Sequence, residues 1–113
     1  MAQSLQFECR AKELAENAAA VADLLRAVAN ENRLLVLCFL ATEGELSVNA
    51  LVERVGLSQS ALSQHLAKLR EEQLVSTRRE AQTIFYRIAD PRIGTLMTTL
   101  HNLYCLPDDE RPD

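Results

Sequence analysis

The most reactive side chains in this sequence are those of its three cysteines, Cys9, Cys38 and Cys105. A thiolate can attack an electrophile, ligate a metal or form a disulfide with a second thiol. The chain contains no Cys-x-x-Cys pair, so the spacing alone gives no recognised thiol motif. The cysteines are therefore core filler, reactive thiols or metal ligands, and the elements that carry them must distinguish these roles.

A second group of chemically related side chains begins at residue 58. Between residues 58 and 70 the polar residues are serine, glutamine, histidine, lysine and arginine, and the first acid is Glu71. Serine and glutamine can hydrogen-bond to base edges, while lysine and arginine can bind phosphates. A solvated helix face is the alternative interpretation. The candidate DNA contacts are Ser58, Gln59, Ser60, Ser63, Gln64, His65, Lys68, Arg78 and Arg79.

The charge distribution qualifies this interpretation. The net charge of −4 and the pI near 5.2 argue weakly against a nucleic-acid binder. However, residues 58–92 carry six basic and four acidic side chains, and acidic segments flank them on both sides. Of the 12 cations, 10 are arginine, whose planar fork suits phosphates and guanine edges. The middle of the chain is thus compatible with DNA.

Length and composition limit the fold to one domain. The chain has 113 residues, of which 48% are hydrophobic and 25% are charged. This excludes a disordered chain and a two-domain enzyme with its own cofactor domain. We expect a single domain over residues 1–113, with a folded core at 10–106 and a disordered tail at 107–113.

No targeting segment is visible. The N-terminus lacks the basic and apolar segments of a secretory signal, and the longest apolar run, residues 34–41, is shorter than the ~20 residues that span a membrane. We expect a cytoplasmic protein without a membrane partner. In that reducing compartment the three cysteines do not form a structural disulfide framework.

Helical periodicity is clear at both ends of the chain. Residues 10–29 carry apolar residues at spacings of 4, 3, 4 and 3, and residues 91–105 carry one apolar face. Between them, residues 30–42 form a helix that is apolar all round, which predicts a central, buried position. The outer seams suit packing within the monomer or against a second subunit. Their candidate dimer contacts are Leu14, Val21, Leu25, Leu96, Leu100 and Leu103.

The middle of the chain predicts a helix-turn-helix followed by a hairpin. Ser47 caps a helix to Val55, Gly56 interrupts it, and Ser58 caps a second helix to about residue 73. Residues 74–79 and 83–89 are then rich in β-forming side chains. The fold class is therefore mostly α with a β-hairpin wing, a winged helix-turn-helix whose second helix can enter a major groove.

Three stretches resemble the ArsR/SmtB family of bacterial repressors: residues 25–34, residues 57–70 and Tyr86-Arg87. Residues 58–66, Ser-Gln-Ser-Ala-Leu-Ser-Gln-His-Leu, are the most specific of these, and the resemblance covers about residues 14–105. It implies a homodimer held by the first and last helices. It also implies a repressor that leaves double-stranded operator DNA when it senses an inducer. We expect no cofactor.

Within that family, the cysteines resemble those of the thiol-sensing branch, the BigR/SqrR/HlyU-type repressors. This resemblance implies that Cys38 and Cys105 are the sensing pair, that Cys9 is dispensable, and that persulfides or oxidants are the inducers. The family's metal-site patterns are missing, because Leu46-Ser47-Val48 has no thiol and Asp90 is not followed by the expected histidine. Ala81 departs from the glycine that relatives often have in the wing turn.

Three alternatives stay open. The first is a metal-responsive repressor with an unusual site built from Cys9, Cys38, Cys105 and His101. The second is a small thiol enzyme, although no base is arranged around a cysteine and we expect no catalysis. The third is a dimerisation module, which would not need the acid-free helix face or the basic hairpin.

Overall fold

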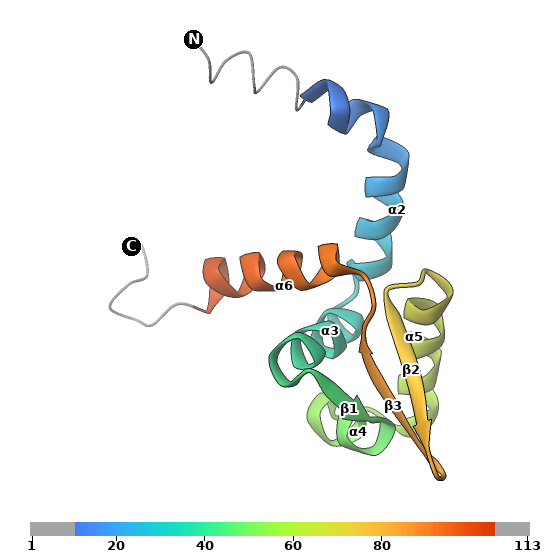
Figure 1. Cartoon of the computed structure of the whole chain (residues 1–113). Coiled ribbons are helices and arrows are strands. Elements are labelled where there is room, and N and C mark those ends of the chain that lie inside the picture. Colours follow the sequence, from blue (N-terminus) through green and yellow to red (C-terminus); the bar gives the residue numbers. More distant parts are fainter. Residues whose placement is uncertain (1–10, 106–113) are drawn as a thin grey trace.

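The computed structural model describes residues 11–105 as a mostly helical body with a small antiparallel sheet (Figure 1). This confirms the predicted winged helix-turn-helix. The elements in chain order are α2 (Ala18–Val28), α3 (Glu31–Glu43), β1 (Glu45–Ser47), α4 (Val48–Val55), α5 (Gln59–Glu71), β2 (Val75–Glu80), β3 (Thr83–Ile88) and α6 (Pro91–Tyr104).

Side-chain caps set the start of four helices. In each, an oxygen of the capping side chain accepts a hydrogen bond from a backbone N–H two or three residues later, over 2.9–3.2 Å. Such a bond satisfies one of the donors that a helix leaves unpaired at its N-terminus. The capping residues are Asn30, Ser47, Ser58 and Asp90, and the sequence predicted the caps at Ser47 and Ser58.

The first predicted helix is interrupted, which corrects the expectation of one helix over residues 10–29. Residues 11–16 are helical, a turn follows at Asn17, and α2 starts at Ala18. The carboxamide of Asn17 donates to the carbonyl oxygen of Glu13 at 2.9 Å. Asparagine competes with the helix in this way because its side chain bonds to nearby backbone groups. The spacing of apolar residues contained no sign of this break.

The core is largely aliphatic. Its largest fully buried side chains come from α3, α4, α5 and α6: Val36, Leu37, Leu40, Leu51, Leu62, Leu66, Leu69 and Ile93. The prediction that α3 is buried on every side is wrong, because Leu35 is 37% exposed and Cys38 is half-buried. One side of α3 therefore faces outward beside α6.

The sheet has the strand order β1-β3-β2 and contains the predicted hairpin, with each boundary within one residue. β1 was not predicted, because three residues are too short to show a strand period. Its Leu46 pairs with Tyr86 of β3, and both side chains are buried. At the turn between β2 and β3, Ala81 adopts a φ of 56°, the left-handed region that favours glycine.

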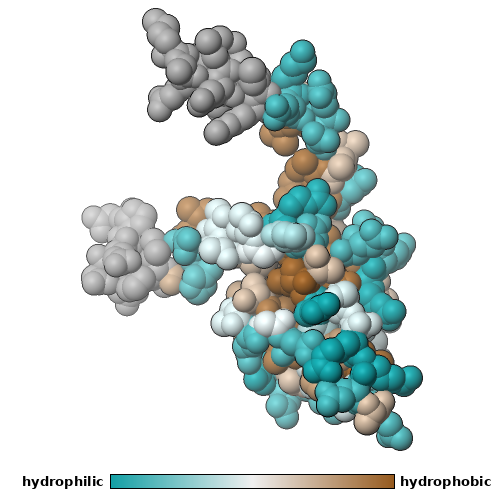
Figure 2. Space-filling view, viewed as in Figure 1, coloured by the Kyte–Doolittle hydropathy of each residue, from teal (hydrophilic) through white to brown (hydrophobic). Residues whose placement is uncertain are grey.

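The projecting helices α2 and α6 and the tip of the wing lie at opposite ends of the described chain. α2 and α6 extend from the end of the body that lies opposite the tip of the wing (Figure 1). Figure 2 shows hydrophobic patches along α2, whereas the surface around the wing tip is mostly hydrophilic. No helix within residues 11–105 is long and apolar enough to cross a membrane.

Candidate nucleic-acid interface and thiol cavity

Helix α5 separates an apolar face from a polar one. Leu62, Leu66 and Leu69 are buried in the core, with at most 1% of their surface exposed. The predicted DNA contacts of this helix and its cap lie on the other face. Ser58, Gln59, Ser60, Ser63, Gln64 and Lys68 are exposed, and His65 is half-buried. The face therefore offers neutral and cationic hydrogen-bonding groups, and no acid precedes Glu71.

The turn before α5 fixes how this helix projects. Gly56 ends α4 with a φ of 79°, and its backbone N–H donates to the carbonyl oxygen of Val52 at 2.9 Å. A glycine at this position closes α4 and turns the chain directly toward the cap of α5 at Ser58. The pairing of α4 with α5 is thus the helix-turn-helix that the sequence predicted.

The two predicted wing arginines have different surroundings. Both are exposed on β2, where Arg78 pairs with Phe85 and Arg79 pairs with Ile84. Within residues 11–105, Arg79 has no ion-pair partner. Arg79 can therefore bind a phosphate without first breaking an ion pair.

Arg78, in contrast, is already bound. Its Nε donates to Glu45 at 2.8 Å and its Nη1 donates to Glu80 at 2.8 Å. The guanidinium also lies 4.4 Å from the ring centroid of Phe85. The hydrogen bonds from Arg78 lower the pKa of the Glu45 carboxyl, and those to Glu45 and Glu80 raise the pKa of Arg78. The sequence contained no sign of this network, because Glu45 lies far from Arg78 along the chain.

Cys38 and Cys105 line one cavity between α3 and α6. The cavity has a volume of about 420 Å³. Both thiols are free; Cys38 is half-buried and Cys105 is exposed. The remaining lining is mostly apolar and consists of Glu31, Leu34, Leu35, Met97, Leu100, His101 and Tyr104. The structure therefore brings the two predicted sensing residues to a common site.

His101 belongs to the surroundings of both thiols. It lines the larger cavity with Cys38 and Cys105, and it lines a smaller one of about 180 Å³ with Cys38 and Thr42. The sequence placed it only one turn before Cys105. Within residues 11–105, no three His, Cys, Asp or Glu side chains gather as they would around a metal ion. Cys9, which completed the metal alternative, lies outside the described residues.

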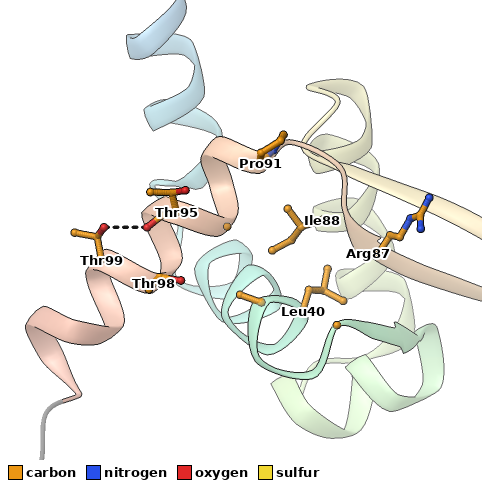
Figure 3. A pocket seen from close by; sticks show the side chains of 10 residues that line it. Leu40, Arg87, Ile88, Pro91, Thr95, Thr98 and Thr99 are labelled. Atoms are coloured by element: carbon orange, nitrogen blue, oxygen red, sulfur yellow. Dashed lines mark hydrogen bonds between the residues drawn. The ribbon is translucent and has the colours of Figure 1, made fainter. Parts of the chain in front are cut away.

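A wider groove of about 610 Å³ lies on another side of α6 (Figure 3). Arg87 is the ionisable side chain in its lining, and neither Cys38 nor Cys105 reaches it. In Figure 3, Thr99 bonds to the backbone oxygen of Thr95, at 2.9 Å. The sequence did not predict this groove. Its threonine-rich wall lacks a group that could act as a nucleophile with an adjacent base.

The predicted dimer contacts lie on the projecting helices. Leu14, Leu25 and Leu103 are 57%, 48% and 64% exposed. Val21, Leu96 and Leu100 are half-buried. Tyr104, also on α6, is 76% exposed. Apolar side chains of this size are seldom left in water when they cluster, so a subunit interface on these helices stays our prediction.

Comparison with known proteins identifies relatives across most of the chain. A family model described as bacterial regulatory protein, arsR family, matches residues 30–77, from the cap of α3 into β2. The transcriptional activator HlyU of Vibrio cholerae serotype O1 is 51% identical over 94 residues, which are 83% of this chain and 86% of that protein.

Solved structures agree with this similarity. Reduced HlyU from Vibrio cholerae has a TM-score of 0.79 and 50% identity, covering 84% of this chain and 99% of that one. The transcriptional repressor BigR from Xylella fastidiosa also has a TM-score of 0.79, with 36% identity, and covers 85% of this chain and 97% of that one.

Proposed function

This chain belongs to the arsR family of bacterial regulatory proteins and is a DNA-binding transcriptional regulator, and we propose that a link between Cys38 and Cys105 releases it from its operator. The inducers are persulfides or other oxidants of thiols. The observation that carries this proposal is that both thiols line one cavity between α3 and α6. Two free thiols at a common site can form a reversible cross-link, whereas a lone thiol gives a less durable signal.

The chemistry requires only the two thiols and a persulfide. The thiolate of one cysteine attacks the outer sulfur of the persulfide, forms a cysteine persulfide and expels the donor's thiolate. The second cysteine thiolate then attacks the inner sulfur of that persulfide, which forms the disulfide and expels hydrosulfide. The persulfide is thereby reduced and the two cysteines are oxidised. A direct disulfide requires Cα atoms within ~7 Å of each other, and a longer sulfur chain relaxes this limit.

The cross-link reaches the DNA-binding elements through the two helices that it joins. α6 carries predicted dimer contacts, and α3 leads directly into β1 and α4. Fixing α6 against α3 therefore changes how the two α5 helices of a homodimer are spaced. Half-sites on DNA lie about 34–36 Å apart. A coupling of ~1–3 kcal/mol would weaken DNA binding ~5–150-fold.

On the DNA side, we assign base-edge and phosphate contacts to the exposed face of α5, with Gln64 as the principal candidate for a base edge. Arg79 is the phosphate contact of the wing, because its guanidinium has no ion-pair partner in the described chain. We assign Arg78 a different role from the one the sequence suggested. It positions the wing through Glu45 and Glu80.

The experiment compares the full-length parent with its Cys38→Ser, Cys105→Ser and Cys9→Ser variants on a duplex selected in vitro for binding to the parent. Each protein is treated with a persulfide donor, and its DNA affinity is measured by fluorescence anisotropy. The parent and Cys9→Ser should be released, while Cys38→Ser and Cys105→Ser should stay bound. Release of Cys38→Ser as readily as the parent would contradict the two-thiol switch.

Mass spectrometry of the same samples identifies the covalent product. A loss of two hydrogens indicates the disulfide, and each additional sulfur atom adds about 32 Da. The product should be confined to one subunit and contain both Cys38 and Cys105. Cross-linking without a change in DNA affinity would separate the chemistry from the regulation and overturn the regulatory part of the proposal.

A further inference from the structure

A small polar cleft lies where three elements meet at the wing end of the molecule. It has a volume of about 240 Å³. The start of α4, the start of α5 and the turn of the wing form its walls. The lining residues are Ser47, Val48, Asn49, Gln59, Gln82, Thr83 and Ile84. Of these, the sequence singled out only Gln59 as a DNA contact.

The cleft is lined by neutral hydrogen-bonding groups. Asn49 of α4, Gln59 of α5 and Gln82 of the wing turn line it together, and the carboxamide of each side chain has two N–H donors. Ser47 accepts a hydrogen bond from the backbone N–H of Ala50 at 3.1 Å, which leaves its own hydroxyl proton available. Within residues 11–105, none of the three carboxamides has a hydrogen-bond partner.

The lining of the cleft carries no charge that would repel an anion. None of its seven lining residues is ionisable. On β2, beside the wing turn, Glu80 is bound by Arg78, which also binds Glu45 of β1. Arg79, next to them on the same strand, has no such partner within residues 11–105. An anion entering the cleft therefore meets N–H and O–H donors, and the two acids of the neighbouring strands are both engaged by Arg78.

We propose that this cleft seats one phosphate of the DNA backbone and thereby fixes the distance between the reading helix and the wing. A free anion would be held weakly, because the cleft contains no cation of its own. A backbone phosphate is different, since α5 and Arg79 bind the same duplex and deliver it to the cleft. The inference rests on DNA binding by α5 and not on the thiol switch.

The nature of the donors gives the proposal a distinctive signature. A carboxamide releases no counterion when it contacts a phosphate, so its loss should not change the salt dependence of binding. Because backbone contacts carry no sequence information, its loss should also weaken binding to every sequence equally. Loss of a cationic contact would change the salt dependence of binding. Loss of a base contact would weaken binding to the selected sequence alone.

The test measures the affinity of the reduced protein for its selected duplex and for a mixed-sequence duplex of the same length, from low to high salt. Asn49→Ala and Gln82→Ala should each weaken both complexes by about 3–10-fold, which is the size of one neutral hydrogen bond. The slope of log affinity against log salt should match that of the parent. Gln64→Ala is the matched control, because a lost base contact should weaken the selected duplex alone.

A second measurement locates the contact on the DNA. Single phosphates of the selected duplex are replaced in turn by neutral methylphosphonates. One position should weaken the parent but leave Gln82→Ala unchanged, because that variant has already lost the contact. Unaltered affinity in both alanine variants, or a loss limited to the selected sequence, would overturn the proposal. So would saturable binding of inorganic phosphate in the cleft, seen by NMR, in variants that bind DNA like the parent.

Discussion

Arg78 of β2 bonds to Glu45 of β1 across the central strand of the sheet, with Nε to Oε1 at 2.8 Å. On its way the guanidinium passes over the ring of Phe85, which belongs to β3 between them. One side chain thus joins all three strands at the base of the wing. The contact fixes the orientation of the hairpin relative to the strand that leads into α4.

The carboxyl of Glu45 should therefore titrate below its ordinary value of 4.5, because hydrogen bonds from Arg78 stabilise its charged form. A group with a lowered pKa contributes to stability above its unfolded pKa, and this contribution is lost as pH falls through the folded value. Carbon NMR of the glutamate carboxyls measures the midpoint. Arg78→Ala should return it toward 4.5, and an unchanged midpoint would mean that the ion pair does not persist in solution.

Arg79 should contribute to DNA binding through its positive charge. We expect Arg79→Ala to weaken binding to every sequence and to flatten the salt slope by about one unit, because one phosphate contact is lost. Arg26→Ala is the matched control, since Arg26 is exposed on α2 and pairs with Asp23. Anisotropy at several salt concentrations measures both slopes. Equal slopes for Arg79→Ala and the parent would remove the wing from the DNA interface.

The turn of the wing should be strained. Ala81 has a φ of 56°, a conformation that costs an L-residue roughly 1–2 kcal/mol relative to ordinary backbone. Ala81→Gly should therefore raise the free energy of unfolding, by up to about 1 kcal/mol after the greater entropy of glycine is subtracted. Ala67→Gly, at an exposed position in α5, should lower it by about 1 kcal/mol. Urea denaturation measures the free energy of unfolding of both variants. A lower value in both would argue against a strained turn at Ala81.

The exposed leucines of the projecting helices should hold two subunits together. Leu25 and Leu103 are 48% and 64% exposed, so a glutamate at either position disturbs little in the monomer but places a charge in the proposed interface. Leu25→Glu and Leu103→Glu should sediment as monomers. Ile84→Glu on the wing, where the residue is 36% exposed, should leave the dimer intact. Dimers in both leucine variants would defeat this assignment.

Local signals in the sequence predicted most of the fold. Ser58 caps α5 and Gly56 ends α4 because these effects act within a few residues, and such effects can be recognised in a linear sequence. The break at Asn17 was missed, since it results from one side chain competing with the helix. β1 was missed because its pairing with β3 joins residues that are far apart along the chain.

Of the candidate sites, too, only a part could be predicted from the sequence. The polar face of α5 follows from helical spacing, and the common cavity of Cys38 and Cys105 agrees with the pairing that the family resemblance implied. The ion pair of Arg78 with Glu45 could not be predicted. Glu45 lies on β1, which precedes the helix-turn-helix in the chain, whereas Arg78 follows it. The cleft that contains Asn49 and Gln82 is likewise a product of tertiary structure.

The end of α3 offers a further route by which the thiol state could reach the DNA. Arg54 of α4 donates from Nε and Nη2 to the two carboxylate oxygens of Glu43, at 3.0 and 2.9 Å, and these bonds lower the pKa of Glu43. Glu43 follows Cys38 on the same helix, one turn and a residue later. If the proposed cross-link moves α3, this contact would carry the movement directly to the first helix of the helix-turn-helix.

Loss of this contact should weaken the coupling and leave the chemistry intact. In Glu43→Gln, the Cys38–Cys105 link should form as in the parent, but the ratio of reduced to cross-linked DNA affinity should fall by about two- to fivefold, the effect expected of a partly exposed ion pair. The exchanged pair Glu43→Arg with Arg54→Glu should restore the ratio. Anisotropy on both states measures it, with mass spectrometry to verify the link. A ratio equal to the parent's in Glu43→Gln would mean that the signal reaches α5 through the subunit interface alone.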